Sequence, residues 1–94
     1  MDPMTKEELL AAHHEFPGPF RIKAIGAGGG NFSERIVAAI TLELIGTDGM
    51  EYTVRDTAGG RHQAITVNLQ VQSPEHVLAI YARLRAVEGL TILL

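Results

Sequence analysis

The 94-residue chain contains no cysteine and no tryptophan, and only 5% of its residues are aromatic. Without cysteine it forms no disulfide, offers no thiolate nucleophile and builds no cysteine-ligated zinc site. The chain also lacks the run of about 20 apolar residues that a membrane-spanning helix requires. Its first residues are acidic, where a secretory signal peptide would be basic and then apolar. We therefore expect a cytoplasmic protein that is stabilised by packing alone.

The size and charge of the chain narrow its class further. The net charge is −3, from 8 basic and 11 acidic residues, which argues against broad electrostatic binding of nucleic acid. An apolar content of 46% indicates a globular protein, and the length allows one core. We expect a leading helical segment at residues 1–15 and a single domain at residues 16–94. So small a core leaves no room for a large cofactor, and we expect none.

The residues that catalysis would need do not form a recognisable motif. Ser33 and Ser73 are the only serines, and each lies at a predicted helix start, where serine acts as a cap. No Gly-x-Ser-x-Gly motif is present. His13 and His14 are adjacent, so on a helix their side chains diverge and do not converge on one metal ion. We expect neither an enzyme nor a metal site.

Three segments show the capping residues and apolar spacing of helices. The first, at residues 5–14, begins with a capping-box pair formed by Thr5 and Glu8. The second runs from Asn31 to about residue 45, and Glu34 is expected to reach back to the backbone of Asn31. The third begins at Ser73-Pro74-Glu75, and Gly89 is placed to end it in a left-handed cap.

Four segments alternate between apolar and polar residues, as half-buried strands do. They are residues 20–27, 50–57, 65–72 and 90–94. The third alternates most regularly, with one polar face and one apolar face made by Ile65, Val67, Leu69 and Val71. Loops are expected at Gly46-Thr47-Asp48-Gly49 and at Ala58-Gly59-Gly60, where glycine supplies the positive φ of a tight hairpin.

The element order is βαββαβ behind a leading helix, which predicts an α+β protein of the ferredoxin-like type. Right-handed crossovers give a four-stranded antiparallel sheet of order 4-1-3-2 with two helices on one face. The other face of the sheet is then polar and uncovered.

Several short motifs together resemble the YbeD-like family of small uncharacterised bacterial proteins, over roughly residues 8–94. The matching residues are Glu8-Leu9-Leu10, Glu15-Phe16-Pro17, Pro19-Phe20, Lys23, Gly26, Gly59-Gly60, Ser73-Pro74-Glu75-His76 and Tyr81. The pair His13-His14 and the glycine-rich loop depart from the family pattern. The resemblance implies a ferredoxin-like fold similar to ACT-type regulatory domains, and it carries over no catalytic or binding residue.

The glycine-rich loop is the first candidate site. Its residues lie between a predicted strand and a predicted helix start, where backbone N–H groups can hold an anion: Gly26, Gly28, Gly29, Gly30 and Asn31. In ACT-type domains, to which the chain is similar, the corresponding loop lines the ligand pocket. The dinucleotide motif Gly-x-Gly-x-x-Gly fails because Asn31 replaces its last glycine. The alternative is a turn in which the glycines have no binding role and adopt φ values that other residues rarely adopt.

The uncovered sheet face is the second candidate. Arg21, Lys23, Arg55 and Asn68 are expected on it, with Ile25 and Leu93 as its apolar members. We interpret the protein as a small binding or regulatory module that contacts a protein partner or a small metabolite. RNA binding by this face is the alternative, although base-stacking aromatics are missing from it. A purely solvated face and a homodimer through sheet edges also remain open.

Overall fold

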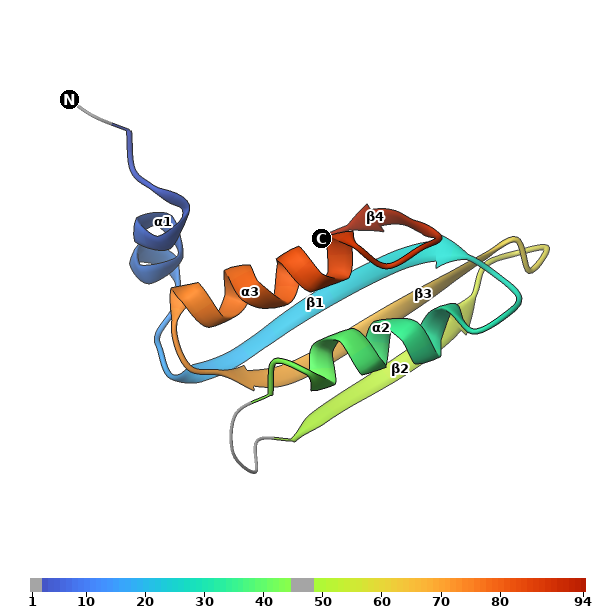
Figure 1. Cartoon of the computed structure of the whole chain (residues 1–94), viewed down its shortest axis with the longest axis horizontal. Coiled ribbons are helices and arrows are strands. Elements are labelled where there is room, and N and C mark those ends of the chain that lie inside the picture. The colour runs from blue at the N-terminus through green and yellow to red at the C-terminus, as the bar shows by residue number, and fades with distance from the viewer. Residues whose placement is uncertain (1–2, 45–48) are drawn as a thin grey trace.

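The computed structural model of the protein describes residues 3–44 and 49–94. Its elements follow the predicted order, and α2 and α3 lie side by side on one face of the sheet (Figure 1). The strands pair antiparallel in the order β2-β3-β1-β4, which is the predicted order read from the opposite edge. The ferredoxin-like prediction is confirmed. The elements are α1 (Lys6–His13), β1 (Gly18–Ala27), α2 (Phe32–Thr41), β2 (Met50–Asp56), β3 (His62–Val71), α3 (Pro74–Arg85) and β4 (Leu90–Leu93).

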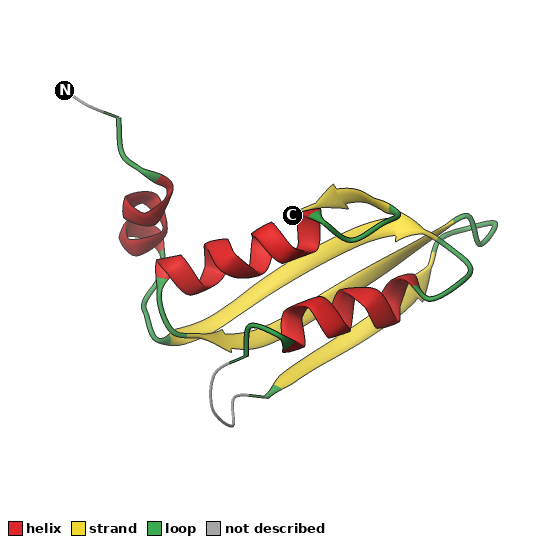
Figure 2. Ribbon diagram, in the orientation of Figure 1, coloured by secondary structure: helices red, strands yellow, loops and turns green. Residues whose placement is uncertain are grey.

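Figure 2 shows the two helices α2 and α3 over one face of the sheet. The core lies between these helices and the sheet. Every second side chain of β1 and β3 points toward the helices. The spacing of apolar residues in α2 and α3 gives each helix an apolar face, which packs against these side chains. Burial of each large apolar side chain contributes about 1.5–3 kcal/mol. The buried residues include Ile22, Ala24, Phe32, Ile36, Ile40, Ile65, Val67, Leu69, Val71, Val77, Ile80 and Leu84.

Gly26 makes room for the largest fully buried side chain, Phe32 at the start of α2. A Cβ atom added at Gly26 would lie 2.3 Å from Cζ of Phe32 and 2.6 Å from the carbonyl oxygen of Gly89. A Cβ atom in a real protein does not approach other heavy atoms so closely. The glycine is therefore required by close approach of the ring, and its φ is not positive.

Two helix starts follow their predictions and one does not. The Thr5–Glu8 capping box is present, with Thr5 N–H donating to Glu8 Oε1 at 3.2 Å and Glu8 N–H donating to Thr5 Oγ1 at 3.1 Å. Ser73 caps α3 by accepting from His76 N–H at 3.1 Å. Asn31 is the residue before α2, but its side chain makes no capping bond. The expected pair with Glu34 is wrong, because Asn31 has φ −111° and ψ 32° and lacks the extended backbone that side-chain capping uses.

Two helices end before the residues that the pattern indicated. Helix α2 ends at Thr41, after which Glu43 N–H donates to the Ile40 carbonyl at 2.9 Å in a tighter turn. Helix α3 ends at Arg85, so Gly89 does not cap it. Gly89 has φ 93° and lies in the turn before β4, where its carbonyl accepts from Ala27 N–H at 3.0 Å. The end predicted for α2 and most of the loop predicted at residues 46–49 lie outside the described residues.

The register of β4 corrects one assignment to the open sheet face. Leu93 pairs with Ala24, whose side chain is buried under the helices, so Leu93 packs against the core. Ile92 pairs with Ile25 and takes the place on the open face that was expected for Leu93. The register shifts between Ile25 and Gly26, and a shift of one residue moves every side chain to the opposite face of a sheet.

Candidate binding surface on the open sheet face

Strand register places four of the predicted site residues in neighbouring rows of the open face. Residues that pair directly on adjacent strands project their side chains on the same side. One row across β1, β3 and β2 holds Arg21, Asn68 and Glu51, and the next holds Lys23, Thr66 and Thr53. The third row holds Ile25, Ala64 and Arg55.

Arg21 and Asn68 are bonded to each other within the first row. Arg21 Nε donates to Asn68 Oδ1 at 3.1 Å, across the β1–β3 pair. Both side chains are exposed, so the contact links two strands without burying charge. Arg21 Nε and Asn68 Oδ1 are therefore already hydrogen-bonded within the protein.

Lys23 and Arg55 instead border a hollow of about 160 Å³ on the open face. Its other lining residues are Thr53, Thr66 and Ala64. Ala64 is only 7% exposed although it faces the open side, because longer neighbours rise around its methyl group. The hollow therefore exists where a small residue on β3 stands between larger ones on β1 and β2.

The charge of this hollow is uncompensated within the described part of the chain. Neither the Lys23 ammonium nor the Arg55 guanidinium forms a hydrogen bond or an ion pair with any residue in 3–44 or 49–94. Two cations and two threonine hydroxyls thus surround one shallow site. Lysine, arginine and hydroxyl donors are the groups that bind carboxylate and phosphate oxygens. The arrangement suits one small anionic group.

The glycine-rich loop does not line this hollow. Gly28 N–H donates to the Arg61 carbonyl at 2.8 Å, and a Cβ atom at Gly28 would lie 2.4 Å from the carbonyl oxygen of Gly60. The loop is therefore packed against the β2–β3 turn. Gly29 and Gly30 have φ of 79° and 66°, which favours glycine in a turn. These contacts give the loop a structural explanation, and its role as a ligand site stays a prediction.

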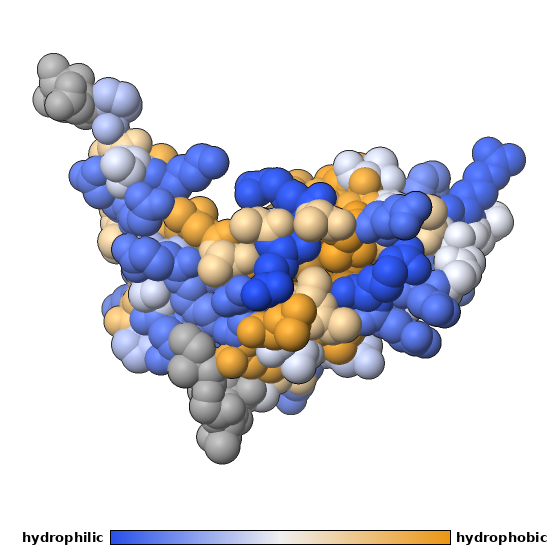
Figure 3. Space-filling view, viewed as in Figure 1, coloured by the Kyte–Doolittle hydropathy of each residue, from blue (hydrophilic) through white to orange (hydrophobic). Residues whose placement is uncertain are grey.

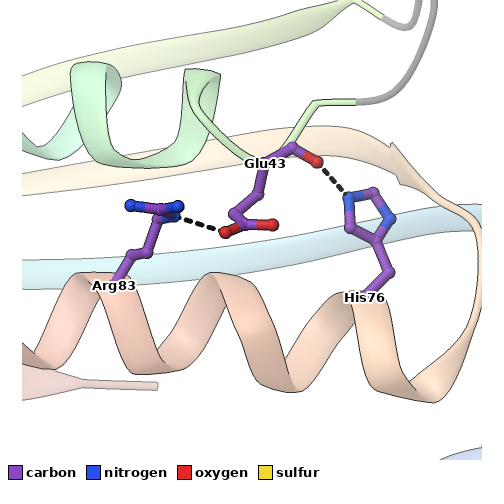
Figure 4. A network of polar contacts seen from close by, with 3 residues as sticks. All are labelled: Glu43, His76 and Arg83. Carbon is purple, nitrogen blue, oxygen red and sulfur yellow. Dashed lines mark hydrogen bonds and ion pairs between the residues drawn. The ribbon is translucent and has the colours of Figure 1, made fainter.

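His76 is the buried polar residue of the described structure, and its contacts are structural (Figure 4). Its Nδ1 accepts from Gln72 N–H at 3.0 Å, so Nε2 carries the proton and donates to the Glu43 carbonyl. The Glu43 carboxylate also pairs with Arg83, two turns further along α3. Nε2 holds α3 to the end of α2 and Nδ1 binds the segment just before α3, so neither ring nitrogen is left for catalysis or metal binding.

A second depression, of about 310 Å³, lies between α1 and α3 and was not predicted from the sequence. Apolar side chains are visible at this recess in the space-filling view (Figure 3). The Tyr81 hydroxyl within it donates to the Leu94 carbonyl at 3.3 Å, and burial raises the pKa of Tyr81 while the nearby Arg85 charge opposes that rise. The lining residues are Lys6, Leu9, Leu10, Phe20, Val77, Leu78, Tyr81 and Arg85.

Two properties of the described residues limit the kinds of site that the protein can form. Residues 3–44 and 49–94 contain no group of three or more histidine, aspartate or glutamate side chains placed to hold a metal ion. Within the same ranges, none of the helices has the length and apolar character needed to span a bilayer.

Comparison with known proteins places the chain among small bacterial proteins and gives the fold a solved counterpart. Residues 11–94 match the model of a family described as "Protein of unknown function (DUF493)". A UPF0250 protein of Hahella chejuensis is 26% identical over 88% of this chain and 91% of its own length. A UPF0250 protein of Shewanella sediminis is 31% identical over 80% of this chain and 83% of its own length. These matches confirm the YbeD-like resemblance.

Among solved structures, the ACT domain from GTP pyrophosphokinase of Chlorobium tepidum superposes with a TM-score of 0.62. The match covers 81% of this chain and 94% of that domain, at 14% sequence identity. At this identity the likeness concerns the fold alone. The ACT-like architecture expected from the resemblance is thereby confirmed.

Proposed function

The chain belongs to the DUF493 family of proteins of unknown function, and from this premise we propose that it is a small non-catalytic binding module that contacts a protein partner or a small metabolite. The contact is made by the open sheet face, where the hollow between Lys23 and Arg55 receives an anionic group of the ligand. A carboxylate of an acidic peptide and a carboxylate or phosphate of a metabolite share the required chemistry.

The observation that carries this proposal is the pair of uncompensated cations around the small Ala64. A cation on a protein surface is ordinary, but here the pair shares a concave site with two hydroxyl groups. Donors that surround one point bind an anion more strongly than the same donors scattered over a surface. The absence of catalysis is supported by the chemistry of the site, since it contains no carboxylate or imidazole to move a proton.

The RNA alternative has less support. Single-stranded RNA is bound on open sheets by aromatic side chains on which the bases stack. The described open face offers no Phe, Tyr or Trp, because Tyr52 pairs with the buried Val67 and therefore projects to the helix side, and its one imidazole, His62, lies at the end of β3. Cations alone provide the salt-dependent and sequence-independent part of such binding.

Titration followed by amide NMR tests the proposal at low ionic strength. The probes are tetraglutamate peptide, inorganic pyrophosphate and a single-stranded RNA oligonucleotide. We expect the first two to shift the amides of Lys23, Thr53 and Thr66, and we expect Lys23→Gln to weaken that binding at least about fivefold, which corresponds to about 1 kcal/mol. The matched control is Lys6→Gln, which removes a lysine from the α1–α3 depression and should leave the titration unchanged.

The proposal fails if neither acidic probe shifts these amides. It also fails if Lys23→Gln and Lys6→Gln weaken the titration equally, since the interaction would then follow net charge. A response confined to the RNA oligonucleotide would favour the alternative function.

A further inference from the structure

Strand β2 is an open sheet edge, and the usual protection that it carries is its charged residues, Glu51, Arg55 and Asp56. Within the described residues it pairs with β3 on one side only, and Figure 1 shows no element beyond it. It is seven residues long and contains no proline, whereas β4, at the opposite edge, is four residues long. Natural proteins shorten or block exposed edges because their unpaired N–H and C=O groups recruit other strands.

The side of β2 that faces the helices is also uncovered. Its apolar residues pair with buried residues of β3, Tyr52 with Val67 and Val54 with Ile65. Even so, Tyr52 is 49% exposed and Val54 is 41% exposed, because α2 packs over β1 and β3 and leaves this edge bare. The edge thus offers free backbone groups together with two adjacent apolar side chains.

The backbone groups that point outward from β2 are identified by the hairpin. Thr57 N–H donates to the His62 carbonyl at 2.9 Å, so this pair is hydrogen-bonded. Hydrogen-bonded and non-hydrogen-bonded pairs alternate along an antiparallel ladder. Residues 51, 53 and 55 therefore direct their N–H and C=O groups toward β3, and residues 50, 52, 54 and 56 direct theirs to the free edge.

We propose that β2 pairs with β2 of a second copy of this chain, antiparallel and centred on Thr53, to form a continuous eight-stranded sheet. In this register Tyr52 lies opposite Val54 of the second copy, and both present outward N–H and C=O groups for hydrogen bonding. Met50 and Asp56 match in the same way. Thr53 lies opposite its own copy on the two-fold axis, as a closed symmetric dimer requires.

Charge selects this register over its neighbours. On the open face Glu51 falls opposite Arg55 of the second copy, and the symmetry makes the same pair twice. On the helix side the symmetry twice sets an aromatic residue opposite a β-branched one, which is a favourable cross-strand pair. Moving the centre to Tyr52 or to Val54 still matches the hydrogen-bonding groups, but both alternatives remove the opposition of Glu51 and Arg55.

The pairing shares Arg55 and Thr53 with the proposed anion site, but the two proposals can be tested separately. A guanidinium has five N–H donors, enough for Glu51 of the second copy and for an anion in the hollow. Lys23, whose substitution tests the hollow, lies on β1 and takes no part in the edge. The dimer and the anion site can therefore fail separately.

Charge reversal tests the interface in solution. By light scattering and sedimentation we expect the unmodified chain to show twice its 10.2 kDa mass at micromolar concentration. Glu51→Arg sets two arginines opposite each other, and Arg55→Glu sets two glutamates opposite each other, so each should weaken the dimer at least about tenfold. The double variant Glu51→Arg/Arg55→Glu restores the opposite charges and should restore the mass. Arg61→Glu, an exposed reversal outside the strand, should leave the mass unchanged.

Because the chain has no cysteine, a single introduced one tests the register directly. Opposite residues of a non-hydrogen-bonded pair have Cα atoms about 4.5 Å apart, within the range of a disulfide. Thr53→Cys should give a cross-linked dimer on mild oxidation, and Asp56→Cys on the same strand should not. A monomer at all concentrations, a dimer unaffected by either charge reversal, or equal cross-linking of the two cysteine variants would each overturn the proposal.

Discussion

His76 on α3 donates its Nε2–H to the backbone carbonyl of Glu43, which follows the end of α2. The same ring accepts from Gln72 N–H through Nδ1, so one buried side chain satisfies backbone groups from two segments. With the ion pair between Glu43 and Arg83, this fixes α2 and α3 relative to each other above the sheet. The contribution of the His76 contacts to the free energy of unfolding can be measured.

We expect His76→Ala to lower the free energy of unfolding by about 2–3 kcal/mol, since the substitution removes the hydrogen bonds that the buried ring makes to the Gln72 N–H and the Glu43 carbonyl. Urea denaturation followed by circular dichroism measures the change. His62→Ala removes an exposed histidine and serves as the control, with a change below about 0.5 kcal/mol. Equal midpoints for the two variants would show that the His76 contacts do not stabilise the fold.

Gly26→Ala should destabilise the protein by about 1–3 kcal/mol, because the new methyl group overlaps the Phe32 ring inside the core. Gly49→Ala is a suitable control, because a Cβ atom at Gly49 meets nothing within 4 Å. Thermal melting of the two variants gives the comparison. If Gly26→Ala melts with the unmodified protein, the ring does not occupy the position described.

Alkaline pH should destabilise the protein in part through Tyr81. Burial raises the pKa of Tyr81 in the folded state above its ordinary value, and the Arg85 charge offsets part of the rise. As the pH increases above about 10, the unfolded chain therefore loses this proton first, and the free energy of unfolding falls. We expect it to fall more steeply between pH 9 and 11 in the unmodified protein than in Tyr81→Phe. Parallel pH profiles would contradict this assignment.

The sequence predicted β3 and α3 from their apolar periods, α1 from its capping pair and α2 from the length of its segment. The alternation from Ile65 to Val71 identified β3, and the spacing of Val77, Ile80 and Leu84 identified the buried face of α3. The errors arose where local geometry interrupts the period. The register shift after Ile25 reversed the assignment of Leu93, and the backbone of Asn31 prevented the cap that its residue type favours.

For the candidate surface, alternation correctly grouped Arg21, Lys23, Arg55 and Asn68 on one side of the sheet. Alternation alone does not show which of them are neighbours, since this depends on register across three strands. The register joins Arg21 to Asn68 and leaves Lys23 and Arg55 around Ala64. The small size of Ala64 was a signal available in the sequence, but its meaning depends on which residues stand beside it.

Lys23 links the proposed anion site on the open face to the last residue of the chain, which lies beside β1 after β4. Its side chain borders the hollow, while its backbone exchanges hydrogen bonds with Leu94, N–H to carbonyl at 3.1 Å in one direction and 2.8 Å in the other. An anion that holds the side chain still also steadies the backbone to which the last residue is bound. If the proposed site binds an anion, we therefore expect the solvent-exchange rate of the Leu94 amide proton to fall, although Leu94 does not line the hollow.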